Sequence, residues 1–207
     1  MNISHHSPRW LALATLLLLS SLASADVLKI VINDTIHPIT DEFIGRAIAE
    51  AQRNHDEALL IELRTPGGLV DSTRTIVEKI LASPVPVIVY VAPSGGRAAS
   101  AGFYILESAD VAAMAPGTNA GAAHPVIFGG KDMDPIMKDK MENDAAAFMR
   151  SFVSKRGRNV EVAESAVRQS KSFTEQEALS QKLIDYVASD DQDLFKQMEG
   201  TDRKSVV

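Results

Sequence analysis

Residues 87–102 have the sequence VIVYVAPSGGRAASAG, in which a five-residue apolar run precedes a loop of small residues. An unbroken run of β-branched and aromatic residues is typical of a strand buried on both faces of a parallel sheet. The small residues that follow predict a helix from about Ala98 to Ser108, beginning just beyond the carboxyl end of that strand. Ser100 then lies in the first turn of the helix, where backbone N–H groups point outward.

Outward from this segment, short apolar runs alternate with longer amphipathic ones, which indicates crossover units and a sheet covered by helices. No repeat or linker interrupts the pattern, so we predict a single domain of the α/β class. The predicted strands are residues 27–33, 58–63, 111–115 and 183–187, and the predicted helices are 40–54 (capped by Thr40-Asp41), 70–82, 134–155, 160–169 and 174–180.

The N-terminal residues have the pattern of a signal peptide. Arg9 precedes an apolar run at 10–19, and Ala23-Ser24-Ala25 has the small-x-small pattern of a cleavage site. The alternative is a membrane anchor, but the run is shorter than the roughly 20 residues that a spanning helix needs. We therefore expect residues 1–25 to be removed on export to the periplasm or another extracytoplasmic space. The domain is expected at 26–188, with a surface helix and tail at 189–207.

Charge and composition exclude several classes of function. The chain has 21 Lys and Arg against 27 Asp and Glu, a formal net charge of −6, and no basic cluster, so nucleic acid is not an expected partner. There is no cysteine, which excludes a thiolate nucleophile and Cys-based metal sites. No two histidines of the mature chain have ligand spacing on one helix, and no metal is expected. A nucleophile must therefore be Ser, Thr, Lys or a carboxylate.

Ser100 is the candidate nucleophile. An oxyanion that forms beside it would meet the N–H groups and the dipole of the helix N-terminus. The pair Gly67-Gly68 ends the preceding strand, and glycines there allow a backbone N–H to face a cleft. Two loops from adjacent strands could then share an oxyanion hole. The simpler interpretation of Ser100 alone is an ordinary residue at a helix start.

Five motifs are spaced along the chain: Thr65-Pro66-Gly67-Gly68, 97–102, 115–125, Gly157-Arg158-Asn159 and Glu177-Ala178-Leu179. Together they resemble the protease domain of the NfeD family, membrane-associated relatives of the Clp proteolytic subunit. The resemblance implies a Clp protease-like or crotonase-like ββα spiral and a serine endopeptidase with a Ser/Lys dyad and no cofactor. It assigns Ser100 as the nucleophile and the N–H groups of Gly68 and Ala101 as oxyanion donors. Counted back from Gly157-Arg158-Asn159, the lysine of the family's dyad corresponds to Lys140.

The base has alternatives. Lys131 and Lys138 lie in the same region, and Lys138 is about 160° around the helix from Lys140. A lysine accepts a proton only when desolvation lowers a pKa of about 10.4, so the base should be half-buried against an apolar wall. The expected wall is Met137, Met141, Ala145 and Phe148.

His124 is the rival base, because a histidine needs no large pKa shift. It lies near the position of the Clp histidine, likewise just before a proline. The Clp arrangement also has an orienting aspartate, and the matching residues Ser170-Lys171-Ser172-Phe173 contain none. His124 is therefore interpreted as a residue that lines the cleft.

The resemblance also implies partners. Proteases of this family prefer apolar segments, including the C-terminal region of stomatin-type membrane proteins, and form homodimers. Longer members continue into transmembrane helices and a small β-barrel, which this sequence lacks, so we expect a short or truncated form. Two other functions remain open: a non-catalytic scaffold or chaperone-like partner of a stomatin assembly, and an acyl-CoA enzyme of the crotonase type, against which the signal peptide argues.

Overall fold

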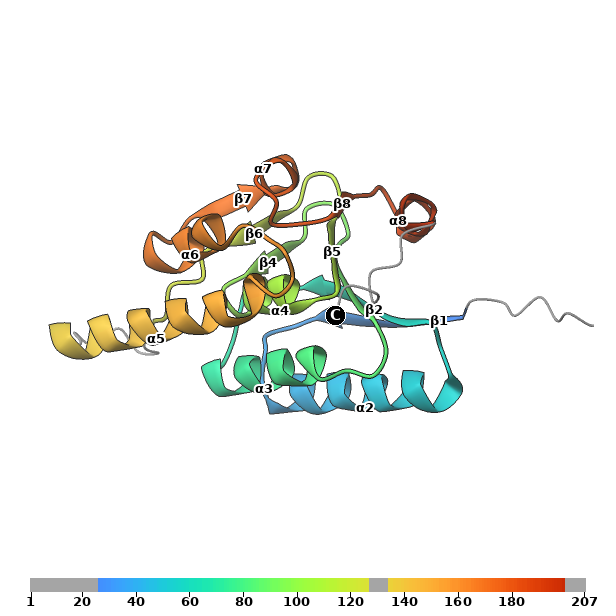
Figure 1. The fold of residues 1–207 in the computed structure, drawn as a ribbon, viewed down its shortest axis with the longest axis horizontal. Helices are drawn as coiled ribbons and strands as arrows, with labels where there is room; N and C mark the ends of the chain where they lie inside the picture. Colours follow the sequence, from blue (N-terminus) through green and yellow to red (C-terminus); the bar gives the residue numbers. More distant parts are fainter. Residues whose placement is uncertain (1–25, 127–133, 200–207) are drawn as a thin grey trace, which may run out of the picture.

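The computed structural model describes residues 26–126 and 134–199. The signal peptide expected at residues 1–25 and Lys131 lie outside the described residues. A five-stranded, all-parallel sheet forms the centre of the molecule (Figure 1). Its order is β1 (Val27–Asn33), β2 (Ala58–Arg64), β3 (Val87–Val91), β5 (Val111–Met114) and β8 (Tyr186–Val187). The predicted α/β class with a parallel sheet is confirmed, and β8 is shorter than the strand expected at 183–187.

The central strands β3 and β5 are buried on both faces, as the apolar run of β3 predicts, whereas the edge strand β1 exposes alternate residues. Helices α2 (Pro38–Asn54) and α3 (Val70–Leu81) cover one face (Figure 1), where they bury Ile44 and Ile76. The other face packs against α8 (Asp191–Met198), which buries Leu194 completely. The helix expected in the tail is therefore attached to the main sheet.

A second, smaller sheet corrects the prediction around Ser100. Its strands are β4 (Arg97–Ala99), β6 (Asn119–Gly121) and β7 (Ser172–Thr174). The helix expected from Ala98 begins at Ala101, as α4 (Ala101–Ser108). Small residues are compatible with a helix or a strand, and here backbone pairing with Thr65 favours the strand. The Thr65 N–H donates to the Arg97 carbonyl at 2.8 Å, and the Thr65 carbonyl accepts from the Ala99 N–H at 3.1 Å.

Helix starts depend on capping groups. The cap expected at Thr40-Asp41 is wrong, because α2 begins at Pro38 and the His37 side chain accepts from the Ile39 N–H. Proline is favoured at this first position because it has no N–H to satisfy. The short helix predicted at 174–180 is confirmed as α7 (Glu175–Ser180), and Thr174 and Glu177 form a capping box at its start.

Helix α5 (Pro135–Val153) and α6 (Val160–Arg168) pack against one another beside the small sheet. The last turns of α5 bury Met149, Phe152 and Val153, whereas its first half is exposed and reaches past the central sheet (Figure 1). Among the described residues, none of the helices has the length and apolar character needed to cross a bilayer.

Glu107, at the end of α4, is an acidic side chain with no solvent exposure. Its carboxyl oxygens have no hydrogen-bond partner within the described residues. The nearest charges are Arg158, which donates to the Glu107 backbone carbonyl at 2.8 Å, and Asp185, which pairs with Arg158 at 2.9 Å. Burial dominates and raises the pKa of Glu107 to about 8. The group is therefore mostly protonated in the folded protein at neutral pH.

Glu107 should make stability depend on pH. The unfolded chain loses this proton near pH 4.5 and the folded chain near 8, so the free energy of unfolding should fall as pH rises between these values. Glu107→Gln, which is neutral at every pH, should exceed the wild type in free energy of unfolding by about 3–5 kcal/mol at pH 8.5 and match it near pH 4.5. Urea denaturation at several pH values measures this. Exposed Glu161→Gln is the control, and equal pH slopes in all three proteins would refute the expectation.

Candidate active site

Ser100 occupies a sharp turn between β4 and α4. Its backbone has φ 54° and ψ −114°, which is strained for a non-glycine residue, and its hydroxyl forms no capping hydrogen bond. The turn is held on both sides, since the Ser100 N–H donates to the Gly121 carbonyl at 2.8 Å and its carbonyl accepts from Phe103 at 3.0 Å. Serine nucleophiles of α/β hydrolases lie on a similar strained strand-to-helix turn.

The Gly67-Gly68 segment lies directly beside this serine. Gly67 has φ +118°, and a Cβ there would come within 2.7 Å of the Ser100 Cβ. A Cβ on Gly68 would meet the Ile36 backbone at 2.0 Å, because this segment pairs with Ile36 through hydrogen bonds on either side. Both positions therefore require glycine, one for the serine and one for the strand pairing that holds the loop.

Two unused backbone donors border the same cavity as Ser100. Within the described residues, the N–H groups of Gly68 and Ala101 donate no hydrogen bond, and both residues line that cavity. The Ala101 N–H is also the first of α4, where the helix dipole favours negative charge. Chemically, such a pair of donors beside a hydroxyl can stabilise an oxyanion.

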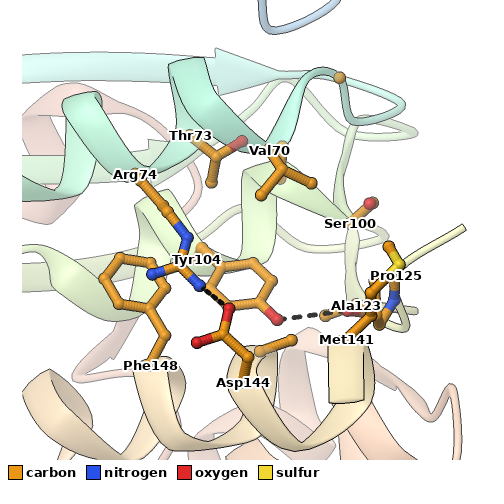
Figure 2. A pocket seen from close by; sticks show the side chains of 13 residues that line it. Val70, Thr73, Arg74, Ser100, Tyr104, Ala123, Pro125, Met141, Asp144 and Phe148 are labelled. Carbon is orange, nitrogen blue, oxygen red and sulfur yellow. Dashed lines mark hydrogen bonds and ion pairs between the residues drawn. The ribbon is translucent and has the colours of Figure 1, made fainter. Parts of the chain in front are cut away.

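The cavity has a volume of about 150 Å³ and lies between α3, α4 and α5. Tyr104, one turn after Ser100 on α4, lies across it, and its hydroxyl donates to the Ala123 carbonyl at 3.4 Å (Figure 2). Burial holds the pKa of the Tyr104 phenol well above its usual value, so this group stays protonated. The other lining side chains are mostly apolar: Val70, Thr73, Arg74, Ala123, Pro125, Met141, Asp144, Ala145 and Phe148.

The expected apolar wall is present in part. Met141, Ala145 and Phe148 line the cavity, whereas Met137 is half-exposed and does not. Lys140, on the same helix, is exposed in the single chain and is not among the lining residues. The expectation that this lysine is half-buried is therefore not met within one chain. Successive residues of a helix point about 100° apart, so Lys140 points away from the cavity that Met141 lines.

His124 also lies outside the lining residues, although both of its neighbours belong to them. Its Nδ1 lies 3.0 Å from the Val167 carbonyl, which favours the tautomer with the proton on Nδ1. Glu142 approaches the same nitrogen at 3.9 Å, so α5 provides a carboxylate that the sequence around 170–173 does not. This distance is too long for a hydrogen bond.

The cavity residues that sequence reasoning missed include Arg74, Tyr104 and Asp144. Tyr104 was recognisable in principle, since it lies four residues after Ser100 and hence on the same helix face. Arg74 and Asp144 belong to different helices, and only the packing of α3 against α5 brings them together.

A search of family models matches residues 26–204 to the N-terminal domain of NfeD1b. The chain is 37% identical over 197 residues to the membrane-bound protease PH1510 of Pyrococcus horikoshii, covering 94% of this chain and 45% of that protein. It is 39% identical over 92 residues to the membrane protein NfeD1b of Bacillus subtilis, covering 44% and 20%. The chain thus spans less than half the length of these relatives.

The fold of this chain is also similar to the folds of several solved structures. A serine-to-alanine variant of the 1510-N membrane-bound stomatin-specific protease superposes with a TM-score of 0.82 at 36% identity, covering 87% of each chain. A lysine-to-alanine variant of 1510-N, in complex with a substrate peptide, has a TM-score of 0.80 at 37% identity and covers 87% of this chain and 83% of that one. ClpP1 from Listeria monocytogenes, at 16% identity, has a TM-score of 0.63 over 79% and 92% of the chains, which shows a shared fold.

Proposed function

Because the chain belongs to the family of NfeD1b N-terminal domains, we propose that it is a serine endopeptidase with Ser100 as nucleophile and Lys140 as general base. The observation that supports this best is the placement of three groups around one mostly apolar cavity: a serine with a strained backbone, whose hydroxyl forms no capping hydrogen bond, and two N–H groups that donate no hydrogen bond within the described residues. The similar 1510-N structures, one with a serine and one with a lysine replaced, agree with a Ser/Lys dyad.

In the proposed reaction, the Ser100 Oγ attacks the peptide carbonyl carbon while the base takes the hydroxyl proton. The N–H groups of Gly68 and Ala101 donate to the resulting oxyanion. The base then gives the proton to the amine as the C–N bond breaks. Water, deprotonated by the same base, cleaves the acyl ester and restores the serine.

Lys140 needs help to serve as this base. In the single chain it is exposed, so a substrate or a second copy of the chain must cover it and remove water from its amine. Exposed Ile136 and Met137 lie on the same part of α5 and supply apolar surface for such a contact. We therefore include the homodimer in the proposal.

The proposed substrate is an apolar segment of a membrane protein. The mostly apolar cavity beside Ser100 suits an uncharged aliphatic side chain, and the similar 1510-N protease is described as stomatin-specific. A stomatin-type protein is thus the proposed partner. The family match begins at residue 26, directly after the proposed signal peptide, which supports export of the domain.

A non-catalytic scaffold for a stomatin assembly is the second candidate, favoured by the exposure of Lys140. An acyl-CoA enzyme of the crotonase type, and the finer description of the fold as crotonase-like, gain no support from the comparisons. The deciding experiment incubates the protein with apolar peptides and with a serine-directed fluorophosphonate. Cleavage together with labelling of Ser100 supports the protease, whereas failure of both at concentrations where the protein is dimeric supports the scaffold.

Gly67→Ala should slow fluorophosphonate labelling of Ser100 about 100-fold, because the new Cβ must displace the serine by a few tenths of an ångström or more. Gly95→Ala is the matched control: Gly95 also has a positive φ, +80°, but nothing lies within 4 Å of its would-be Cβ. Both variants should lose about 1 kcal/mol of stability to strain, and only the first should lose labelling. Equal labelling rates in the two variants would refute the role of Gly67.

A further inference from the structure

The cavity beside Ser100 has a charged outer wall. Arg74 on α3 forms an ion pair with Asp144 on α5, and both side chains line the cavity. In Figure 2 this pair lies across the cavity from Ser100, on the far side of the Tyr104 ring. The Arg74 side chain is 33% exposed and that of Asp144 71%, so the wall faces solvent on its outer side.

Arg74 is held in place by more than its ion pair. Its guanidinium carbon lies 4.3 Å from the centroid of the Phe148 ring, and that ring stacks on Tyr104 at 6.0 Å. Among the described residues, every ion pair or hydrogen bond between α3 and α5 involves Arg74. Arg74 is therefore the side chain that connects α3 to α5 at the cavity wall.

From this arrangement we propose that the Arg74–Asp144 pair determines the charge preference of the protease for the residue on the acyl side of the scissile bond. This rests on the proposed function. The side chain of that residue branches from the Cα that is bonded to the attacked carbonyl carbon, so when Ser100 attacks, the side chain enters the adjoining cavity. The paired charges cancel, and the otherwise apolar lining favours an uncharged side chain.

Removing one charge of the Arg74–Asp144 pair should create a preference for a substrate side chain of the opposite charge to the one that remains. Asp144→Asn leaves a guanidinium at the wall and should favour an acidic side chain. Arg74→Met leaves a carboxylate and should favour a basic one. Because the pair is partly exposed, each change should be modest, about fivefold, and should shrink at high salt, which screens exposed charges.

The experiment uses one apolar peptide with four residues at the acyl-side position: Glu, its isostere Gln, Lys, and its isostere norleucine. Ratios of kcat/KM are compared for Glu over Gln and for Lys over norleucine. Asp144→Asn should raise the first ratio about fivefold and Arg74→Met the second about fivefold. Both shifts should disappear in the double variant and decline in 1 M NaCl. Arg150→Met, which breaks the Arg150–Glu164 pair elsewhere on α5, is the control and should change neither ratio.

A binding measurement separates this proposal from the proposed function. The same peptides, fluorescently labelled, are titrated against the Ser100→Ala protein with and without each wall substitution. Shifted affinity ratios without turnover by the wild type would overturn the proposed protease activity and would still support the role of the Arg74–Asp144 pair in selecting side chains by charge. Unchanged ratios in both binding and turnover, or no binding of any peptide, would overturn the proposed role of the Arg74–Asp144 pair. Thermal unfolding of each variant ensures that only folded proteins are compared.

Discussion

Ser100→Ala should abolish peptide cleavage, lowering kcat by about 10⁴-fold or more, as replacement of a serine nucleophile does in other serine proteases. The substitution removes only the Oγ. The backbone contacts of Ser100 with Gly121 and Phe103 use main-chain atoms and are retained. Alanine at φ 54° has the same backbone strain as serine, so stability should change little. Initial rates with an apolar peptide, together with a urea denaturation curve, measure both effects.

The control for this change is Ser94→Ala, an exposed serine in the loop that precedes β4. It should cleave and react with the fluorophosphonate as the wild type does. Retention of more than a tenth of the wild-type rate in purified Ser100→Ala would show that another group is the nucleophile. Loss of activity in Ser94→Ala alone would point to the same conclusion.

Lys140→Ala should lower kcat/KM by about 10³-fold, because Ser100 then lacks a group to accept its proton. Initial rates of cleavage of an apolar peptide by the wild type and the variant measure this loss. Since Lys140 is exposed in a single chain, its contribution should appear only at protein concentrations where sedimentation shows an assembly, or where substrate saturates the site.

Two substitutions act as controls for the base. Lys138→Ala removes an exposed amine from the same helix and should leave the rate within about threefold of the wild type. His124→Ala tests the rival base, whose Nδ1 contacts the Val167 carbonyl. Cleavage and labelling that survive Lys140→Ala but disappear in His124→Ala would reverse the assignment. The carboxylate of Glu142 would then be the orienting group, by moving closer than its present 3.9 Å.

The class of the fold could be predicted from local patterns. The five apolar residues of β3 predict a strand buried on both faces, and the alternation of strands with amphipathic helices predicts a parallel sheet; both are confirmed. The placement of Ser100 near Gly68 was also accessible, because parallel strands bring the loops at their carboxyl ends to one edge of the sheet. These features depend on residues close in sequence and on a general rule of topology.

The small sheet could not be predicted in this way. Residues 97–99 have no strong preference for helix or strand, and their state depends on hydrogen bonds to Thr65 and on the neighbouring strand β6. The strained backbone of Ser100 has the same origin, since it connects a strand paired on two sides to a helix that begins one residue later.

The sequence by itself determined the alternating strands and helices, the glycine-rich loops and the serine after β3, because hydrophobic periodicity and glycine conformational freedom are local properties. Only the tertiary structure decided that Arg74 meets Asp144 at the cavity wall, that Glu107 is buried without hydrogen-bond partners for its carboxyl oxygens, and that Lys140 faces solvent. Each of these depends on which helix faces pack together. That packing is a collective result of burying the whole core, which no short stretch of residues specifies.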